Sequence, residues 1–377
     1  MPEPFKNLFN AQLITAMAHH FKRVWQPFKK DAFITQAIRG LDALELKQRS
    51  SQITRAMECC LPSTFSESAP ILVRSLHPAD NEDISNQGMD ERGIRGWATM
   101  PMCEFVGLHG LEEFELGLSV QRELTKRGSA EFGVRHFILK DQAAALATLT
   151  RWAKDPNYHV RRLASEGSRP RLPWAMRLPT LIGNPAPLFP LLNLLKDDPT
   201  EYVRRSVANA LNDIAKDHPD DVAAIATTWL EDASRERHKL VRHACRTLIK
   251  QGHEKALTAF GYHKPKHLQV QLALLTPVVQ FGDALQFTLD LRSEATVAQA
   301  LVVDYIIHHR KANGKTSPKV FKWKTVTVEP GGSHSAHRQH SIKLITTRTY
   351  YPGTHRLEVV VNGESQDAAD FELDMLD

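Results

Sequence analysis

Apolar residues recur at the spacing of α-helices through most of the first 260 positions. Near the start, Leu13, Ile14 and Met17 fall on one side of such a helix. Spacings of three and four residues place side chains on one helical face, so these stripes predict helices that pack on a core. Between positions 78 and 110, glycines and prolines interrupt the pattern. This interval predicts a long irregular connection.

A repeated motif organises the middle of the chain. Residues 155–162 follow the pattern Asp-Pro-x-x-x-Val-Arg-Arg, residues 198–205 repeat it, and residues 240–243 form a looser copy. Periods near 40 residues with two helices each are typical of HEAT-type solenoids. Aligning the copies places Glu166 and Asp213 on the same side of neighbouring repeats.

Near residue 265 the helical period gives way to alternation of apolar and polar residues, which predicts strands with one buried face. About seven short strands in roughly 110 residues indicate an immunoglobulin-like sandwich. His334, His337 and His340 fall in a Gly/Ser-rich segment that we interpret as a loop without a metal, because no carboxylate or thiolate accompanies them. The predicted strands are 268–272, 285–291, 300–308, 320–328, 341–346, 356–362 and 370–374.

The predicted fold is therefore mainly α. A HEAT-like α-solenoid over residues 1–264 is followed by a small all-β immunoglobulin-like sandwich over residues 265–377. With 42% hydrophobic and 24% charged residues, the 377-residue chain is predicted to be neither disordered nor a membrane protein. The N-terminus lacks the features of a secretion signal, so we expect a cytoplasmic protein that meets the nucleoid when it acts. Four cysteines without a CxxC spacing indicate neither a disulfide framework nor a thiolate zinc site.

Charge is concentrated in the middle of the chain. Lys and Arg number 17 against 18 acids over residues 1–150, 19 against 13 over 151–265, and 12 against 12 over 266–377. Proteins that bind nucleic acid gather cations where the phosphates lie. The central third is therefore the predicted DNA-binding region.

The stretch 159–174 carries the candidate chemistry. On a helix, His159, Arg162 and Glu166 share one stripe, which we expect to face outward, and Trp174 follows eight residues after Glu166. A carboxylate on a basic surface weakens phosphate binding unless it serves chemistry at a cationic centre. The simpler alternative is that Arg162 and Glu166 form an ordinary surface ion pair at a spacing of four.

A second segment, residues 124–137, is predicted to contain a helix start. Ser129 is the expected cap and Glu131 would lie in the first turn, where an acid suits the helix dipole. An ion pair between Glu131 and Arg135 is an equally simple alternative.

Three motifs together resemble the AlkC branch of the AlkC/AlkD alkylpurine DNA glycosylase superfamily. They are Glu-Pro-Phe-Lys-Asn-Leu-Phe at 3–9, the segment 124–135, and Val-Arg-Arg-Leu-Ala-Ser-Glu-Gly at 160–167 with Arg-Pro-Arg-Leu-Pro-Trp at 169–174. The resemblance covers residues 1–260, and residues 266–377 look like the immunoglobulin-like extension of some members. Gly128 and His136 depart from the family pattern around Glu131.

The resemblance implies a monomeric, monofunctional glycosylase that acts on double-stranded DNA. It would excise N3-methylated bases, notably 3-methyladenine and 3-methylcytosine. We expect it to do so without full base flipping and without a cofactor. By motif match, Glu166, Asp213 and Glu131 would be catalytic, and Trp174 and Arg162 would contact the lesion. Arg161, Arg169, Arg171, Arg204 and Arg205 are the expected phosphate contacts.

Two other functions remain open from the residues alone. One is a HEAT-type adaptor that binds protein partners, and the other is a module that binds DNA structures without catalysis. Salt dependence separates the adaptor from the DNA-binding functions, because each phosphate contact changes the slope of log K against log salt by about −0.9.

Overall fold

The computed structural model describes residues 4–79 and 88–375 and divides into two compact units, Met1–Asp217 and His218–Asp377. Glu3, the first residue of the motif at 3–9, lies outside the described residues. No helix in the described ranges has the length and apolar character that crossing a membrane requires.

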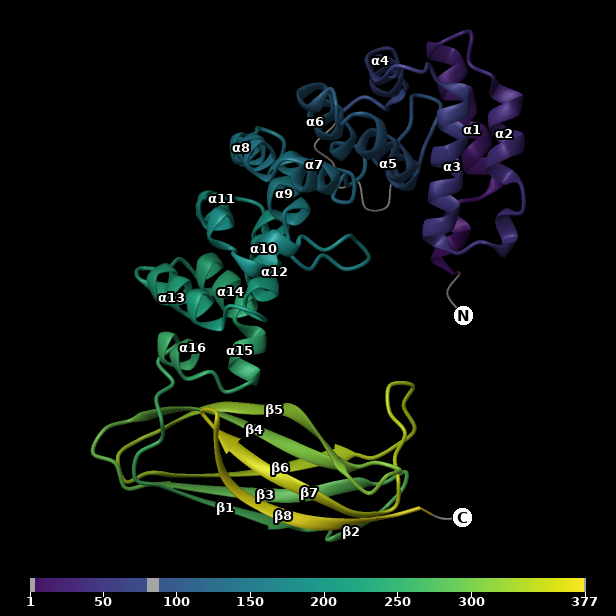
Figure 1. Cartoon of the computed structure of the whole chain (residues 1–377). Helices are drawn as coiled ribbons and strands as arrows, with labels where there is room; N and C mark the ends of the chain where they lie inside the picture. Colours follow the sequence, from purple (N-terminus) through teal and green to yellow (C-terminus); the bar gives the residue numbers. More distant parts are fainter. Residues whose placement is uncertain (1–3, 80–87, 376–377) are drawn as a thin grey trace. The chain divides into compact units, whose positions relative to one another are not determined.

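The first unit consists of helices, and a long loop extends between α9 and α10 (Figure 1). The 3-10 helices among its described residues are η1 (Phe5–Leu8), η2 (Leu41–Ala43), η4 (Gly96–Ala98) and η5 (Ala186–Leu188). Its α-helices are α1 (Ala11–Val24), α2 (Lys30–Ile38), α3 (Leu46–Cys60), α4 (Phe65–Ser75), α5 (Thr99–His109), α6 (Phe114–Thr125), α7 (Val134–Lys140), α8 (Gln142–Trp152), α9 (Tyr158–Gly167), α10 (Pro179–Gly183), α11 (Phe189–Leu195) and α12 (Glu201–Ile214).

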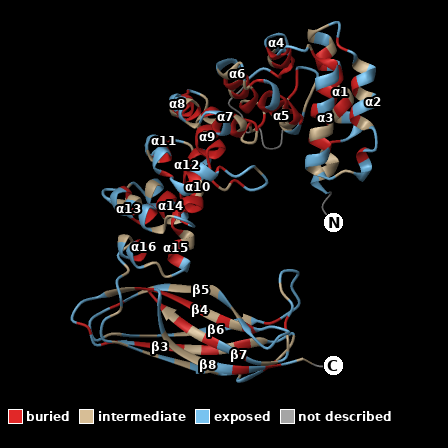
Figure 2. Cartoon of the chain, in the orientation of Figure 1, coloured by how far each residue is buried: buried red, intermediate tan, exposed pale blue. Residues whose placement is uncertain are grey.

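The apolar stripes predicted from the sequence are buried. Ile14 and Met17 of α1 are fully buried, as are Val160 of α9 and Val203 of α12. Figure 2 shows that buried residues are concentrated in α5, α6, α8 and α9, whereas much of α2 is exposed. Helix α9 packs against both α8 and α12, so the two copies of the motif lie side by side.

Helix α5 occupies part of the predicted irregular connection, so that prediction was wrong for residues 99–109. Pro101 is its third residue. Proline is tolerated there because the amides of the first turn have no partner within the helix.

Ion pairs tie each repeat to the next. Arg122 of α6 donates through Nε to Asp155 Oδ2 at 2.8 Å, and Arg161 of α9 donates through Nε and Nη2 to Asp198 at 2.6 and 3.1 Å. Arg161 and Arg204 also donate to the main-chain carbonyls of the Asp-Pro step in their own copy. The Asp-Pro and Arg positions of the motif therefore form the connection between repeats.

The second unit begins with helices and ends as two sheets. The helices are α13 (Pro219–Leu230), α14 (Arg235–Ala244), α15 (Arg246–Lys250) and α16 (Glu254–Ala259). The strands are β1 (Leu268–Leu274), β2 (Val278–Gln280), β3 (Ala284–Ser293), β4 (Gln299–Arg310), β5 (Thr316–Val328), β6 (Ser333–Ser341), β7 (Gly353–Val361) and β8 (Glu364–Asp374).

The strands form one sheet in the order β1-β3-β6 and another in the order β2-β8-β7-β4-β5, with β2 and β8 the parallel pair. A buried core that includes Phe287, Tyr305, Leu357 and Phe371 draws residues from both sheets. The alternating pattern thus predicted the strands because one face of each sheet packs on this core.

One predicted strand and one predicted loop were wrong. The strand expected at 341–346 lies instead at β6, in the segment interpreted as a flexible loop. Along β6, His334, Arg338 and His340 are half-buried, whereas Ser335 and His337 are exposed. Polar residues occupy both faces, so the hydropathy pattern concealed the alternation.

Candidate functional site

Helix α9 supplies the first carboxylate of the candidate site. Asn157 caps this helix by accepting a hydrogen bond from the His159 amide at 2.9 Å. Near the other end, Glu166 is only 5% exposed. Its Oε1 accepts a hydrogen bond from Arg169 Nη1 at 2.6 Å and lies 3.5 Å from Arg162 Nη2. The Arg162–Glu166 pair therefore exists, but it is buried.

Asp213 near the end of α12 supplies the second carboxylate and is 3% exposed. Arg169 Nε donates to Asp213 Oδ2 at 2.9 Å, and Lys216 Nζ donates to Oδ1 at 3.1 Å. Because Arg169 also donates to Glu166, one guanidinium joins the carboxylates of neighbouring repeats. The prediction that Glu166 and Asp213 lie on the same side of the repeats fits this geometry.

Glu131 supplies the third carboxylate from the turn before α7. Its Oε2 accepts hydrogen bonds from Arg162 Nη1 at 2.5 Å and from Ser129 Oγ at 2.7 Å. Helix α7 begins at Val134, so the predicted cap at Ser129 was wrong: the Ser129 hydroxyl bonds to side chains instead of a helix amide. Glu131, Glu166 and Asp213 are thus linked through Arg162 and Arg169, and we call these five residues the carboxylate cluster.

Arginine charge keeps the buried Glu166 ionised. Burial alone would raise the pKa of Glu166, but the charges of Arg162 and Arg169 and hydrogen bonds from Ser206 and Arg169 outweigh it and lower the pKa. Burial likewise opposes the charge on Arg162, but Glu131 and Glu166 raise the pKa of its guanidinium. Glu166 therefore stays ionised at neutral pH.

The charged stripe of α9 does not face outward as predicted. His159 and Glu166 are buried, and Arg162 is mostly covered. The neighbouring turn at 129–131 and helix α12 cover the stripe, which periodicity within one helix cannot reveal.

Trp174 lies in the loop between α9 and α10 and is 61% exposed. Its backbone has φ 64°, a left-handed conformation that is rare for a bulky residue. The Trp174 carbonyl accepts a hydrogen bond from Lys47 Nζ on α3 at 2.8 Å. The predicted lesion contact is therefore an exposed aromatic side chain on a fixed backbone.

The expected phosphate contacts fall into two groups. Arg161, Arg169 and Arg204 direct their donors to protein acceptors in the repeat connections and the carboxylate cluster. Arg171 pairs with Asp217 through Nε and Nη2, both at 2.8 Å, and the exposed Arg205 pairs with Glu201 at 2.6 Å. Only this second group lies in partly or fully exposed ion pairs that a phosphate can replace.

Two side chains at the site were missed. The ring of Tyr202 lies against Arg162, with 5.0 Å from Cζ to the ring centroid. Aligning the repeats would have found it, because Tyr202 stands three positions before Arg205 as His159 stands three before Arg162. The role of Arg135, which the sequence offered only as an alternative ion-pair partner of Glu131, was also missed: its guanidinium donates to the carbonyls of Gly167, Arg169 and Met176.

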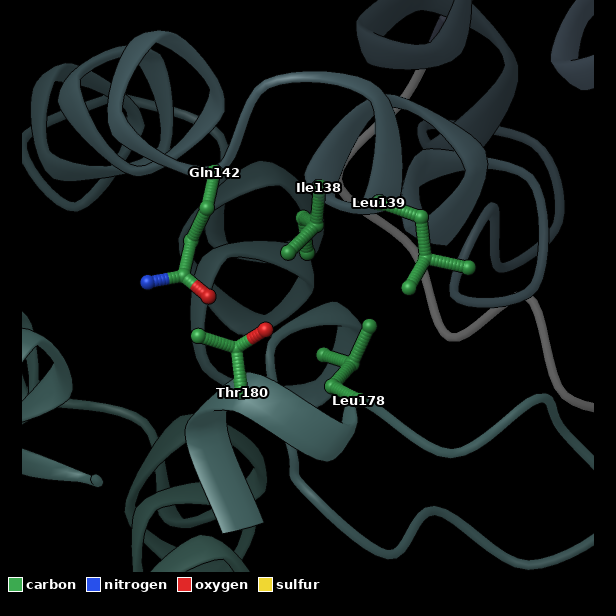
Figure 3. Close-up of a pocket in the computed structure, with 5 residues that line it drawn as sticks. All are labelled: Ile138, Leu139, Gln142, Leu178 and Thr180. Carbon is green, nitrogen blue, oxygen red and sulfur yellow. The ribbon is translucent and has the colours of Figure 1, made fainter. Parts of the chain in front are cut away.

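A separate small pocket contains no ionisable side chain among its lining residues (Figure 3). It is lined by Ile138, Leu139, Gln142, Leu178 and Thr180, none of which was a predicted site residue. Within residues 4–79 and 88–375, no three His, Cys, Asp or Glu side chains are grouped closely enough to hold a metal ion.

Two family models match separate parts of the chain. Residues 127–248 match the model of the DNA alkylation repair enzymes, and residues 269–375 match a C-terminal Ig-like domain defined on the uncharacterised protein YhaZ. The first match includes every residue of the carboxylate cluster.

Two proteins resemble the chain over nearly its full length. YhaZ of Bacillus subtilis (strain 168), which is uncharacterised, is 34% identical over 370 residues, covering 98% of this chain and 99% of that protein. A solved structure of the Pseudomonas fluorescens alkylpurine DNA glycosylase AlkC, bound to DNA containing an abasic site analog, is 35% identical. The match covers 99% of this chain and 100% of that one, with a TM-score of 0.84.

Proposed function

This chain belongs to the family of AlkC-type alkylpurine DNA glycosylases with a C-terminal Ig-like domain, and we propose that it excises N3-methylated bases, 3-methyladenine and 3-methylcytosine, from duplex DNA. The observation that carries the proposal is the carboxylate cluster, in which two arginines hold three carboxylates in one group. The AlkC structure contains DNA with an abasic site analog, which resembles the product of base excision.

The chemistry requires little from the protein beyond charge. A base methylated at N3 is cationic, so its glycosidic bond is weakened and the base leaves without much protonation. The sugar then becomes an oxocarbenium-like cation, which a carboxylate stabilises while it orients the attacking water. We assign this role to Glu166, with Asp213 assisting and Glu131 lining the site, and the reaction involves neither a lysine-dependent lyase step nor a cofactor.

Trp174 and Arg162 complete the proposed site. An exposed indole placed over a cationic base contributes roughly 0.5–2 kcal/mol through a cation–π contact. We propose that Arg171 and Arg205 contact phosphates, whereas Arg161, Arg169 and Arg204 support the fold and the cluster. The HEAT-like repeats would hold the duplex so that the lesion is reached without full base flipping by a monomeric protein.

The test is release of free base from duplex DNA that carries 3-methyladenine or 3-methylcytosine. We expect the native chain to release the base and Glu166→Gln to lose roughly a hundredfold or more in single-turnover rate, as when one electrostatic stabiliser is removed. Glu112→Gln, which removes an exposed carboxylate paired with Lys140, is the control and should keep the native rate.

Two outcomes contradict the proposal. Equal rates in the native chain and Glu166→Gln would remove Glu166 from the chemistry. If neither protein releases a base but both still bind DNA with a steep salt dependence, the chain is a DNA-binding module without catalysis.

A further inference from the structure

The loop that presents Trp174 has a backbone that needs external support. Trp174 adopts φ 64° while its side chain is 61% exposed, so packing of the indole does not fix this conformation. A left-handed conformation costs a non-glycine residue on the order of 1–3 kcal/mol and persists only where the surroundings impose it.

Arg135 supports the base of the loop. This fully buried side chain donates through Nη1 to the Gly167 and Arg169 carbonyls at 2.9 and 2.8 Å, and through Nε to the Met176 carbonyl at 2.7 Å. The segments on either side of Trp174 are thereby held together, but the tip that carries the indole lies beyond these bonds.

Lys47 supports the tip. It lies in the first turn of α3 and donates from Nζ to the carbonyl of Trp174 itself at 2.8 Å. Figure 1 shows the loop between α9 and α10 extending from these helices toward the side of the unit on which α3 lies. The hydrogen bond therefore joins the N-terminal helices to the loop across 127 residues of sequence.

We propose that Lys47 is a positioning residue, which holds the Trp174 backbone so that the indole faces the lesion. This inference rests on the proposed lesion contact of Trp174. Lys47 is itself exposed, so the competing role is a direct phosphate contact, which would act on DNA affinity and not through Trp174.

A double-mutant cycle separates these roles. We expect Lys47→Met to lower the single-turnover rate of base release roughly tenfold at saturating enzyme, because misplacement of a group at the reacting centre is costly. In a Trp174→Ala background, Lys47→Met should cause no further loss. Lys140→Met removes another exposed lysine from the same unit and should leave the rate unchanged.

The salt dependence of DNA binding tests the competing role of Lys47 as a phosphate contact. The slope of log K against log salt should be the same for Lys47→Met and the native chain. A slope shallower by about 0.9, with a loss of rate that is additive with Trp174→Ala, would identify a phosphate contact and overturn the proposal.

A structural readout keeps the inference testable if no base is released. With 5-fluorotryptophan incorporated throughout the full chain, the resonance lost in Trp174→Phe belongs to Trp174. We expect this fluorine signal to shift or broaden in Lys47→Met and to stay unchanged in Lys140→Met. An unmoved Trp174 signal in Lys47→Met would overturn the positioning role, whereas absence of base release by the native chain would overturn only the proposed function.

Discussion

Arg169 joins the two carboxylates of the candidate site that come from different repeats. Its guanidinium donates to Glu166 at 2.6 Å and to Asp213 at 2.9 Å, and the side chain is itself mostly buried. A buried carboxylate without a counter-charge takes up a proton, because desolvation disfavours the charged form. Together with Arg162, Arg169 therefore sets the pH range over which Glu166 can act.

We predict that Arg169→Gln moves the acid limb of base release to higher pH. The native pKa of Glu166 lies below its ordinary value of 4.5, so Glu166 should be ionised throughout the range above pH 5. Without Arg169, burial raises this pKa against Arg162 alone, and activity should fall as the pH drops from neutral. The measurement is the pH profile of the single-turnover rate, with Arg171→Gln as the control that should not move the limb.

The lowered pKa of Glu166 also determines how the stability of the fold changes with pH. Since the folded-state pKa of Glu166 is lowered, its ionisation stabilises the fold above its unfolded-state pKa, and this contribution is lost as the pH falls through the lowered value. For the activity profile, the contradicting outcome is that the rate of base release falls at the same acidic pH in Arg169→Gln as in the native chain. That result would show that Arg169 does not help to keep Glu166 ionised.

At this scale the sequence predicted part of the site. Aligned repeats were enough to associate Glu166 with Asp213, because Glu166 aligns with Asn209 and Asp213 follows four residues later on the same helical face. Glu131 could be placed only by family motif, since its partner Arg162 is 31 residues away. Arg169 was interpreted as a phosphate contact because composition counts cations without revealing which acids they face.

At the scale of helices, the Asp-Pro and Arg positions of the motif connect successive repeats. Asp198 is buried and accepts two hydrogen bonds from Arg161, whose own side chain is largely covered. Breaking a buried pair leaves one charge without compensation and costs more than breaking an exposed pair.

We predict that Asp198→Asn lowers the free energy of unfolding by roughly 3 kcal/mol. Glu201→Gln, only three residues away, breaks the exposed pair with Arg205 and should cost less than about 0.5 kcal/mol. Urea unfolding followed by far-UV circular dichroism measures both. Similar values for the two variants would mean that the Asp198 pair does not stabilise the repeats.

The strands show where the alternation of apolar and polar residues fails to predict the structure. β3 and β7 were predicted because buried and exposed positions alternate with hydropathy along them. β6 carries His334, Arg338 and His340 at half-buried positions where an apolar residue would mark the inner face. Hydropathy alone could not predict β6, because its half-buried positions are mostly polar. Its register is set by antiparallel pairing with β3.

At the scale of the molecule, the compact units divide at Asp217/His218, well before the change from helices to strands. The boundary at 264/265 stays a prediction of where the fold class changes. Within the second unit, the segment between α16 and β1 contacts the sandwich directly: Asn362 Nδ2 donates to the His263 carbonyl at 2.7 Å, and Lys264 pairs with Glu364 at 3.1 Å.

The backbones of Gly252, after α15, and Gly363, in the turn between β7 and β8, approach each other closely. A Cβ added to Gly363 would lie 2.6 Å from the Gly252 carbonyl oxygen, and both glycines have positive φ. We predict that Gly363→Ala destabilises the second unit beyond the backbone cost of a left-handed alanine, roughly 1–2 kcal/mol. Gly314→Ala is the matched control, because its φ of 76° is similar but no atom lies within 4 Å of the added Cβ.

Hydrogen exchange of the intact chain locates the effect. If α15 and α16 are stabilised by the sandwich, amides of both helices should exchange faster in Gly363→Ala than in Gly314→Ala, while those of α1 to α12 stay as in the native chain. Faster exchange confined to β7 and β8 would contradict this, and would mean that the last helices derive their stability from the helices before them. The first result would make α15 and α16 part of the same folding unit as the sandwich, although they directly follow the third copy of the motif at residues 240–243 of α14.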